Sequence, residues 1–300
     1  MGPTASGKTR LALQLAQSLD IEIISVDSAM IYRGMDIGTA KPNKQELAMV
    51  PHHLIDILDP TEHYSAGRFV EDAYKLIQDI HKRGKIPLLV GGTMLYFKVL
   101  TSGLALLPAR DQEVRLQIER EAMAKGWPAL HQKLSSIDKD AAAKIQPEDR
   151  QRIERALEVY YLTHMPISKL QAENLKTDLA VLALALQPQD RSRLHAAIAK
   201  RCQLMLEQGL IAEVKHLQQR GDLSLAHASM RAVGYRQVWE FLEGQFSKAE
   251  LAAKIMAATR QYAKRQLTWL RTFPNVEYFD NEAGDLLTEV YARITRFIAY

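Results

Sequence analysis

The side chains and backbone groups that could do chemistry gather in the first nine residues and at one aspartate. The stretch that fits the pattern G-x-x-x-x-G-K-[ST] is Gly2-Pro3-Thr4-Ala5-Ser6-Gly7-Lys8-Thr9. In this pattern glycines let successive backbone N–H groups surround an anion, while the lysine and a helix N-terminus add positive potential. Asp27 directly follows an apolar run at residues 21–26. The sequence therefore predicts a diphosphate-binding loop with a carboxylate beside it.

Two chemistries are compatible with this loop and this acid. A phosphate loop normally predicts phosphoryl transfer from a nucleoside triphosphate such as ATP, with Thr9 on Mg²⁺ and an aspartate such as Asp27 behind it. An aspartate beside an anion cradle could instead take a proton from an incoming nucleophile while a diphosphate departs. The residues by themselves leave both chemistries open.

These residues need a parallel sheet to position them. Apolar residues at helical spacing after Arg10 predict the helix that follows the loop, and the apolar run 87–93 predicts a buried strand. Ligands in open α/β sheets gather at the carboxyl ends of strands, so Asp27 and Thr93 should lie beside the loop. Because such a loop normally follows a buried strand, we also expect a further strand ahead of Gly2.

The remaining elements predict a core that a helical segment interrupts. Residues 28–42 are expected to form an active-site loop with some helix. Further strands are predicted at 52–57, 181–186 and 276–280, and helices at 64–84, 191–208, 210–219 and 248–272. The predicted fold class is α/β, a P-loop NTPase-like parallel sheet core flanked by helices with a helical insertion domain. Its domains are a core at 1–107 and 172–300 and an insertion at 108–171.

Composition limits the classes of protein that need considering. The 300 residues are 47% hydrophobic and 25% charged, which is ordinary for a globular protein. No apolar run approaches about 18 residues and no leader pattern opens the chain, so we expect a cytoplasmic protein without a membrane span. The single cysteine, Cys202, excludes an internal disulfide and a thiolate-clustered metal site.

Positive charge is concentrated in one block. Residues 187–275 hold 14 Lys or Arg against 7 Asp or Glu, so the block could face a polyanion, although a solvated helical surface would look the same. On the helix predicted at 248–272, Arg260, Lys264 and Arg271 share one face. Tyr262 and Trp269 stand seven residues apart on another face and are expected in the core.

Longer motifs accompany the phosphate loop. They are Ile24-Ser25-Val26-Asp27-Ser28, Tyr32-Arg33-Gly34-Met35-Asp36-Ile37-Gly38-Thr39-Ala40-Lys41-Pro42, Gly91-Gly92-Thr93, Val233-Gly234-Tyr235-Arg236-Gln237 and Thr259-Arg260-Gln261-Tyr262-Ala263-Lys264-Arg265-Gln266-Leu267-Thr268-Trp269. With the loop, and in this order, they resemble the tRNA dimethylallyltransferases, also called tRNA isopentenyltransferases. The resemblance runs from residue 1 to about residue 280 and is far more specific than the loop alone.

The resemblance implies a loop that binds the diphosphate of dimethylallyl diphosphate rather than a nucleotide. The family attaches the five-carbon prenyl group to N6 of adenosine 37 in tRNAs with adenines at positions 36, 37 and 38. A stacked base cannot reach a buried donor, so the adenine must be extruded. The implied cofactor is Mg²⁺, and the implied partner is a tRNA anticodon stem-loop gripped by the insertion and the C-terminal helices of a monomer.

The resemblance also assigns roles to matching positions. Asp27 would be the general base at N6, Lys8 and Thr9 would serve the diphosphate and Mg²⁺ with Thr9 as the metal ligand, and Arg201 would close on the leaving group. The implied donor-binding set is Gly2, Pro3, Thr4, Ala5, Ser6, Gly7, Lys8, Thr9 and Arg201. The implied tRNA-binding set is Asp27, Ser28, Ala29, Met30, Thr93, Arg115, Gln151, Arg152, Ile153, Glu154, Arg155, Arg231, Ala232, Val233, Gly234, Tyr235 and Arg236.

Two positions depart from the family pattern. Met30 stands where many members carry glutamine, so a side-chain hydrogen bond to RNA is not implied there. Ala197 replaces an arginine often found one turn before Arg201, which leaves Arg201 a larger share of the diphosphate charge.

Rival functions are a P-loop small-molecule kinase, an adenylate prenyltransferase and a non-enzymatic RNA-binding protein. The helical insertion of roughly 60 residues and the basic block favour a macromolecular acceptor over a nucleotide. Asp27 beside the loop favours chemistry over binding alone.

Overall fold

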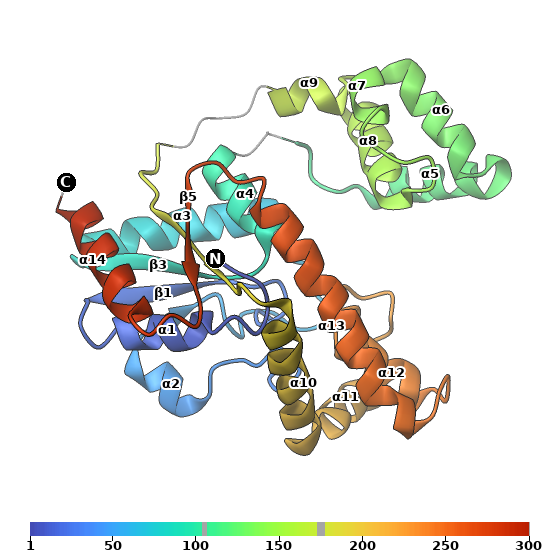
Figure 1. The fold of residues 1–300 in the computed structure, drawn as a ribbon. Helices are drawn as coiled ribbons and strands as arrows, with labels where there is room; N and C mark the ends of the chain where they lie inside the picture. Colours follow the sequence, from blue (N-terminus) through green and yellow to red (C-terminus); the bar gives the residue numbers. More distant parts are fainter. Residues whose placement is uncertain (104–106, 173–177, 300) are drawn as a thin grey trace. The chain divides into compact units, whose positions relative to one another are not determined.

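The structure, a computed structural model, describes residues 1–103, 107–172 and 178–299. The chain divides into two compact units (Figure 1). The first unit consists of Met1–Lys98 and Ala180–Tyr300, and the second is Val99–Leu179. The helical insertion predicted at 108–171 falls inside the second unit.

A parallel sheet of three strands lies at the centre of the first unit. Its order is β2 (His52–His53), β1 (Ile21–Val26) and β3 (Ile86–Gly91). All six residues of β1 are buried, because α1 (Lys8–Leu15) and α14 (Leu286–Ile298) lie on one side of the sheet and α3 (Ala66–Lys82) on the other (Figure 1). Val26 is in register with Gly91, so the carboxyl ends of β1 and β3 are level. The residues that follow these two strands are thereby brought to one edge of the sheet.

A second parallel sheet joins β4 (Ala183–Gln187) and β5 (Val276–Asp280). The backbone of Met1 pairs with β4, since its N atom donates to the Leu184 carbonyl at 2.6 Å and its carbonyl accepts from the Leu186 N–H at 2.9 Å. Beside Met1 is a cavity of about 70 Å³ lined mainly by apolar side chains of α1, β3, β4 and α14. The strand expected ahead of Gly2 stays a prediction.

Four helices in the C-terminal part of the chain pack together, and two of them contact the phosphate loop. They are α10 (Arg191–Glu207), α11 (Leu210–Gln219), α12 (Tyr235–Leu242) and α13 (Lys248–Leu270). α10 packs against α11 and α13, and α12 packs against α11 and α13. Leu194 and Ile198 of α10 and Ala263 of α13 form a small core that also contacts Ala5. The loop therefore rests on the C-terminal helices as well as on the sheet.

The regular elements of the second unit are all helices in its described part. Its helices are α5 (Gln112–Lys125), α6 (Trp127–Ile137), α7 (Lys139–Ala142), α8 (Arg150–Thr163) and α9 (Ile167–Ala172), and α4 (Met94–Ser102) leads into it. Ile118, Leu134, Ile153 and Leu157 are fully buried in its core. In the part of the chain that the structure describes, no helix has the length and apolarity needed to cross a bilayer.

Several predicted elements differ from those observed. The strands at 21–26 and 276–280 have the predicted bounds, whereas the strand expected at 52–57 is limited to the two residues of β2. Residues 28–42 form turns without a helix. An unpredicted helix, α2 (Lys44–Met49), begins at a capping box of Asn43 and Glu46, a signal that was present in the sequence.

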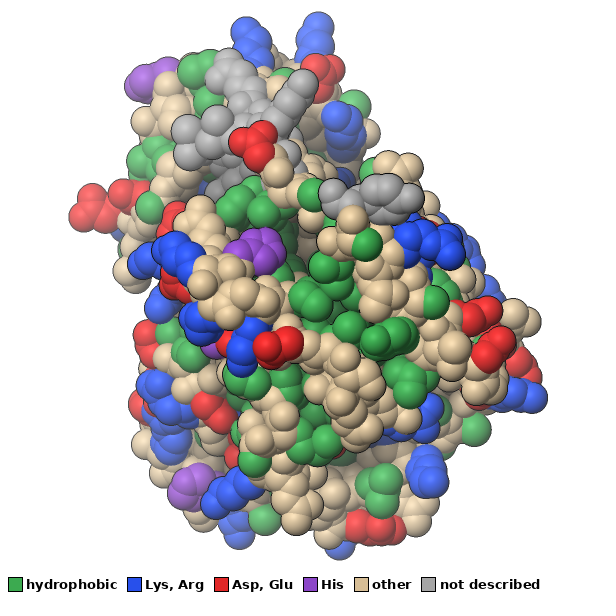
Figure 2. All heavy atoms as spheres, turned by 90° about the vertical axis from the view of Figure 1, so that its left-hand side faces the viewer, with side chains coloured by type: hydrophobic (Ala, Val, Ile, Leu, Met, Phe, Trp, Pro, Cys, Tyr) green, Lys and Arg blue, Asp and Glu red, His purple; other side chains and the backbone are tan. Residues whose placement is uncertain are grey.

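The outer face of α14 carries apolar side chains that remain exposed. Leu287, Tyr291, Phe297 and Ile298 are each more than a third exposed, whereas Val290 and Ile294 are buried against α1. Figure 2 looks onto the side of the molecule where α14 lies in Figure 1 and shows hydrophobic side chains gathered near the middle of that face. Charged side chains lie mostly around them.

Candidate active site

The phosphate loop runs from Gly2 to Gly7 and leads directly into α1. Ala5 and Gly7 have φ angles of 61° and 82°, in the left-handed region that curls the backbone. No side chain caps α1, so its first N–H groups are left for an anion. A Cβ atom at Gly2 would lie 2.7 Å from the Leu186 carbonyl oxygen, so only glycine fits beside β4. The local geometry is that of an anion cradle.

Two half-buried cations lie near this loop. Nζ of Lys8 donates to the Pro3 carbonyl at 2.5 Å, and Nη2 of Arg201 donates to the Thr39 carbonyl at 3.0 Å. Burial, and then the charge of Arg201, lowers the pKa of Lys8 to about 7. Burial also lowers the pKa of Arg201. Within the described ranges neither cation forms an ion pair with a carboxylate, so the two charges are suited to a bound diphosphate.

Asp27 stands at the carboxyl end of β1, where the next turn begins. Its Oδ1 accepts hydrogen bonds from the backbone N atoms of Ala29 at 2.9 Å and Met30 at 3.3 Å. The charge of Asp27 also acts on Lys8 and Arg201, where it opposes the effect of burial on their pKa values. The carboxylate and the two cations therefore share one site, although their roles in the reaction stay predictions.

The end of β3 meets the same turn. The backbone N–H of Ser28 donates to Oγ1 of Thr93 at 3.1 Å, and the backbone N–H of Thr93 donates to the Val26 carbonyl at 3.1 Å. Burial, and then the charge of Asp27, raises the pKa of the Tyr262 phenol on α13. Thr93 and the turn after β1 are thus brought together as predicted from the topology.

A carboxylate on α11 fixes the segment that holds Arg201. Glu213 accepts hydrogen bonds from the three backbone N–H groups of residues 36–38, at 3.0, 2.8 and 3.2 Å. Tyr235 donates its hydroxyl to the same carboxylate at 2.5 Å. Thr39, whose carbonyl accepts from Arg201, follows directly. Glu213 therefore positions Arg201 through the backbone.

The residues present fit a magnesium ion held mostly by substrate oxygens. Among the described residues, no group of three or more His, Cys, Asp or Glu side chains could hold a metal ion. Thr9 offers a half-buried hydroxyl beside the start of α1. Mg²⁺ commonly takes one or two protein ligands together with phosphate oxygens and waters, and this donor set is of that kind.

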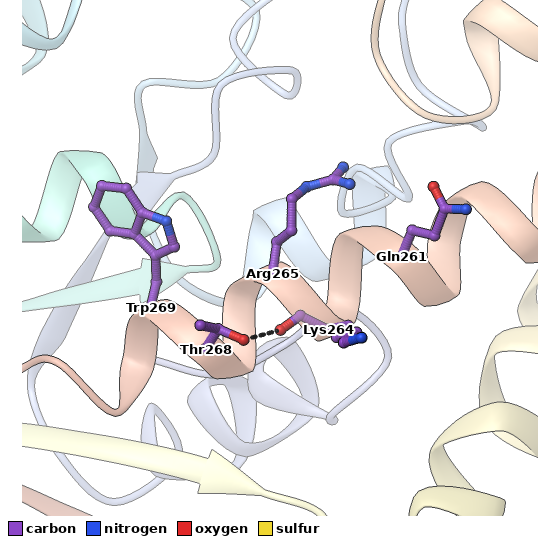
Figure 3. A pocket seen from close by; sticks show the side chains of 5 residues that line it. All are labelled: Gln261, Lys264, Arg265, Thr268 and Trp269. Atoms are coloured by element: carbon purple, nitrogen blue, oxygen red, sulfur yellow. Dashed lines mark hydrogen bonds between the residues drawn. The ribbon is translucent and has the colours of Figure 1, made fainter. Parts of the chain in front are cut away.

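The exposed side of α13 holds an open hollow of about 400 Å³ (Figure 3). It is lined by Gln261, Lys264, Arg265, Thr268 and Trp269. Figure 3 shows Gln261, Arg265 and Trp269 projecting from the same side of the helix. Nζ of Lys98 lies 5.7 Å from the centre of the Trp269 ring. The expectation of a core position for Trp269 is wrong, since its half-buried ring lines this hollow, and cations beside an aromatic ring suit phosphates and bases.

Two arginines predicted to touch RNA serve an ion cluster inside the second unit. Arg115 donates to Glu158 from Nε at 2.7 Å and from Nη2 at 3.0 Å, and its Nη1 lies 2.9 Å from Glu154. Arg155 donates to Glu158 at 2.7 Å and to the Pro108 carbonyl at 2.8 Å. Burial raises the pKa of Glu158, but the hydrogen bonds from Arg115 and Arg155 outweigh it and lower the pKa to about 2. These arginines therefore stabilise the second unit, and their contacts with RNA stay predictions.

Two other residues of the predicted RNA-binding set are buried in this structure. Ile153 is fully buried in the core of the second unit. Tyr235 is likewise fully buried and donates its hydroxyl to Glu213, and RNA contacts of both residues stay predictions. Gln151, Arg152, Arg231 and Arg236 are exposed and stay candidates, as do the turn residues Ser28, Ala29 and Met30.

Some side chains near the site were missed by the sequence reasoning. Glu213 gave no signal, because a single acid on an amphipathic helix is ordinary. Arg265, Gln266 and Thr268 lie inside the motif at residues 259–269. Helical spacing alone does not show which of these side chains faces the hollow and which faces the phosphate loop.

The chain matches known proteins over nearly its whole length. The family model described as IPP transferase matches residues 30–273. A protein of Nitrosococcus oceani named tRNA dimethylallyltransferase is 55% identical over 98% of this chain and 94% of its own length. The crystal structure of the full-length tRNA isopentenylpyrophosphate transferase from Bacillus halodurans is 39% identical, with a TM-score of 0.73, and the match covers 99% of this chain and 95% of that one.

A more distant structure confirms the same fold. It is a eukaryotic dimethylallyltransferase described as acting on tRNA, 28% identical, with a TM-score of 0.81, and the match covers 99% of this chain and 78% of that one. The predicted fold class, an α/β protein with a P-loop-type parallel sheet flanked by helices, is confirmed by these structures. Because the family model and a relative of 55% identity both span most of the sequence, the chain belongs to the IPP transferase family.

Proposed function

We propose that this protein transfers a dimethylallyl group from dimethylallyl diphosphate to N6 of adenosine 37 in tRNAs with adenines at positions 36, 37 and 38. The names of its relatives support the transferred group and the acceptor. The observation that carries the proposal is the joint presence of Lys8, Arg201 and Asp27 at one loop. Two half-buried cations that pair with no carboxylate among the described residues suit a diphosphate leaving group, and a carboxylate beside them suits a base.

The chain's own groups account for the charge and the proton. The reaction breaks the C–O bond between the prenyl carbon and the diphosphate and forms a C–N bond at N6. The electron pair of the broken bond leaves with the diphosphate, where Lys8 and Arg201 stabilise it. N6 loses one proton. Oδ1 of Asp27 already accepts two backbone hydrogen bonds, so we assign this proton to Oδ2.

Mg²⁺ would be bound by the Thr9 hydroxyl together with diphosphate oxygens. When bound, it neutralises charge on the diphosphate. The loop N–H groups, Lys8 and Arg201 bind and orient the same group from the protein side.

The tRNA surface that we propose has three parts. The turn Ser28–Met30 and Thr93 lie beside Asp27, where an extruded adenine must arrive. The hollow on α13 supplies cations and an aromatic ring for the anticodon stem-loop. Gln151 and Arg152 in the insertion at 108–171, and Arg231 and Arg236 ahead of α13, are exposed and add polar contacts. Because tRNA is the acceptor, we place the reaction in the cytoplasm, with the protein acting as a monomer.

The decisive experiment offers the protein an unmodified anticodon stem-loop with labelled dimethylallyl diphosphate and Mg²⁺. We expect label on the stem-loop and none when guanosine replaces adenosine 37. Parallel reactions test ATP as a phosphoryl donor and AMP as an acceptor. Transfer of phosphate from ATP would favour the small-molecule kinase, and prenylation of AMP would favour the adenylate prenyltransferase. Binding of the stem-loop without transfer of any group would favour a binding protein.

A further inference from the structure

The side chain of Gln266 on α13 joins separate parts of the site. Its Oε1 accepts a hydrogen bond from the Thr4 N–H in the phosphate loop at 2.8 Å, and its Nε2 donates to the Gly92 carbonyl after β3 at 2.8 Å. Tyr262 lies one turn earlier on α13, and the side chains of Gln266 and Thr93 oppose the rise in the pKa of its phenol. Gln266 is only 5% exposed, so water competes little for these bonds.

The chemistry of the two backbone partners requires an amide at this position. A peptide N–H only donates and a peptide carbonyl only accepts, so one side chain must offer an acceptor and a donor at the same time. A carboxylate offers only acceptors and an ammonium group only donors. A Cβ atom at Gly92 would lie 2.4 Å from Nε2 of Gln266, so the glycine leaves room for the amide.

The other side of α13 is exposed to solvent. Lys264 and Arg265 are exposed and line the hollow on α13 (Figure 3). The neighbouring Gln266 is buried against the loop. Because an α-helix moves as a stiff element, whatever orders or shifts α13 from its exposed side also acts on the amide of Gln266.

We propose that Gln266 is a positioning residue that couples the two substrates, since it links the RNA-facing helix to the loop that holds the diphosphate. The inference rests on the proposed function, because it takes α13 as a tRNA surface. The backbone N–H of Thr4 donates to Gln266 on α13, so the position of the helix determines the conformation of the phosphate-loop backbone. RNA bound on α13 holds the cradle in the shape that binds diphosphate, and diphosphate in turn strengthens RNA binding by the same factor.

The coupling is measured with inorganic diphosphate and Mg²⁺, titrated calorimetrically with and without a saturating unmodified anticodon stem-loop. Gln266→Met keeps the shape of the side chain and removes both hydrogen bonds. Gln78→Met is the matched control, because Gln78 is exposed on α3. Wild type and control should bind diphosphate about fivefold or more tightly when RNA is bound. Gln266→Met should bind it about tenfold more weakly than wild type, with a ratio near one with and without RNA.

A second variant separates positioning from packing. In Gln266→Glu the new carboxylate still accepts from Thr4 but repels the Gly92 carbonyl until it is protonated. Its diphosphate affinity relative to wild type should therefore be low at about pH 8 and recover toward about pH 5, where a carboxylic acid gains a donor. The pH dependence of diphosphate affinity in Gln266→Glu also tests the inference if Gln266→Met unfolds below the assay temperature.

The inference is overturned if wild type shows no coupling, if Gln266→Met keeps the wild-type affinity and ratio, or if Gln266→Glu shows no recovery at low pH. Diphosphate titration does not depend on prenyl transfer. Coupling that disappears in Gln266→Met while no prenyl group is transferred would therefore contradict the proposed function alone.

Discussion

At Asp27 a structural role and a chemical role coexist in one side chain. Oδ1 closes the turn after β1 through the N–H groups of Ala29 and Met30, and the charge of the carboxylate acts on Lys8 and Arg201. An asparagine can keep the first role, since its Oδ1 still accepts from the turn. It cannot accept a proton at the other atom, so the two roles are separable by mutation.

We predict that Asp27→Asn retains the fold and tRNA binding but lowers the rate of transfer by roughly 10²- to 10⁴-fold, the usual contribution of a positioned general base. Single-turnover kinetics at saturating tRNA measure this rate. Asp20→Asn is a suitable control, because the Asp20 side chain is 73% exposed and lies ahead of the opposite end of β1. A wild-type rate constant for Asp27→Asn would remove Asp27 from the chemistry.

The charge of Lys8 makes diphosphate binding sensitive to pH. Burial, and then Arg201, lowers the pKa of Lys8 to about 7, so the free protein loses this positive charge as pH rises through about 7. A bound diphosphate favours the protonated ammonium, so binding takes up a proton and weakens with rising pH. We expect the diphosphate affinity of wild type to fall between about pH 6 and pH 8 relative to that of Lys8→Arg, whose charge stays constant.

The titration of the ligand itself is common to both proteins, so the ratio of their affinities isolates the contribution of Lys8. Parallel pH profiles for wild type and Lys8→Arg would show that Lys8 stays charged throughout. Arg201→Ala should raise the pKa of Lys8 by removing a neighbouring positive charge, and so shift the fall in affinity to higher pH.

At the scale of elements, the sequence predicted the parts of the fold that depend on local pattern. The buried strand β1 and the loop that opens α1 follow from an apolar run and from glycine spacing, and both are present. The length of β2 could not be predicted. Its pairing with β1 ends at His53, because Leu54 and Asp56 take positive φ angles, which tertiary contacts set and the local sequence pattern does not show. The burial of Ile153 and Tyr235 likewise depends on which helix face meets a neighbour, and helical spacing alone does not decide this.

Within α8, two arginines three residues apart should respond differently to mutation. Arg155 is bonded to the fully buried Glu158, whereas the side chain of Arg152 is 61% exposed and lies 3.4 Å from Asp149. Arg155→Ala should lower the free energy of unfolding by about 2 kcal/mol, less than is typical for a broken buried pair because Arg115 still holds Glu158. Arg152→Ala should change it by less than about 0.5 kcal/mol.

Chemical denaturation of the full chain measures both effects, with the transition of the second unit followed by its own probe, Trp127 on α6. Equal stabilities for the two variants would mean that the cluster around Glu158 contributes nothing beyond an exposed ion pair. tRNA affinity measured on the same proteins should fall for Arg152→Ala if the exposed arginine meets a phosphate.

At the scale of the whole molecule, the chain builds its site from segments far apart in sequence. The loop at residues 2–9 is held by β4, α10 and α13, which lie some 180 to 260 residues later. A tRNA that binds α13 therefore contacts an element that already supports the donor loop. This arrangement predicts that phosphate contacts and base contacts can be separated experimentally, because they fall on different elements.

The cations of α13 should account for the salt dependence of tRNA binding. Arg260, Lys264, Arg265 and Arg271 are exposed on this helix or directly after it. If they meet phosphates, neutralising all four should weaken all tRNAs about equally and reduce the slope of log affinity against log salt by about 0.7 to 0.9 for each phosphate that is no longer bound. Neutralising Lys44, Arg68, Lys75 and Lys82, which are exposed on α2 and α3, changes the net charge equally and should leave the slope unchanged.

The turn after Asp27 should show the opposite behaviour. Ser28→Ala and Met30→Ala would remove groups from the place that we propose for the extruded adenine, so they should lower discrimination for adenines at positions 36 to 38 while the salt slope stays as in wild type. Binding titrations of matched and mismatched stem-loops at several salt concentrations measure both quantities. If the slope survives neutralisation of α13 but falls with the α2 and α3 control, the RNA lies on a different face from the one proposed. If wild type binds no stem-loop at any salt concentration, the small-molecule kinase becomes the better interpretation of the phosphate loop.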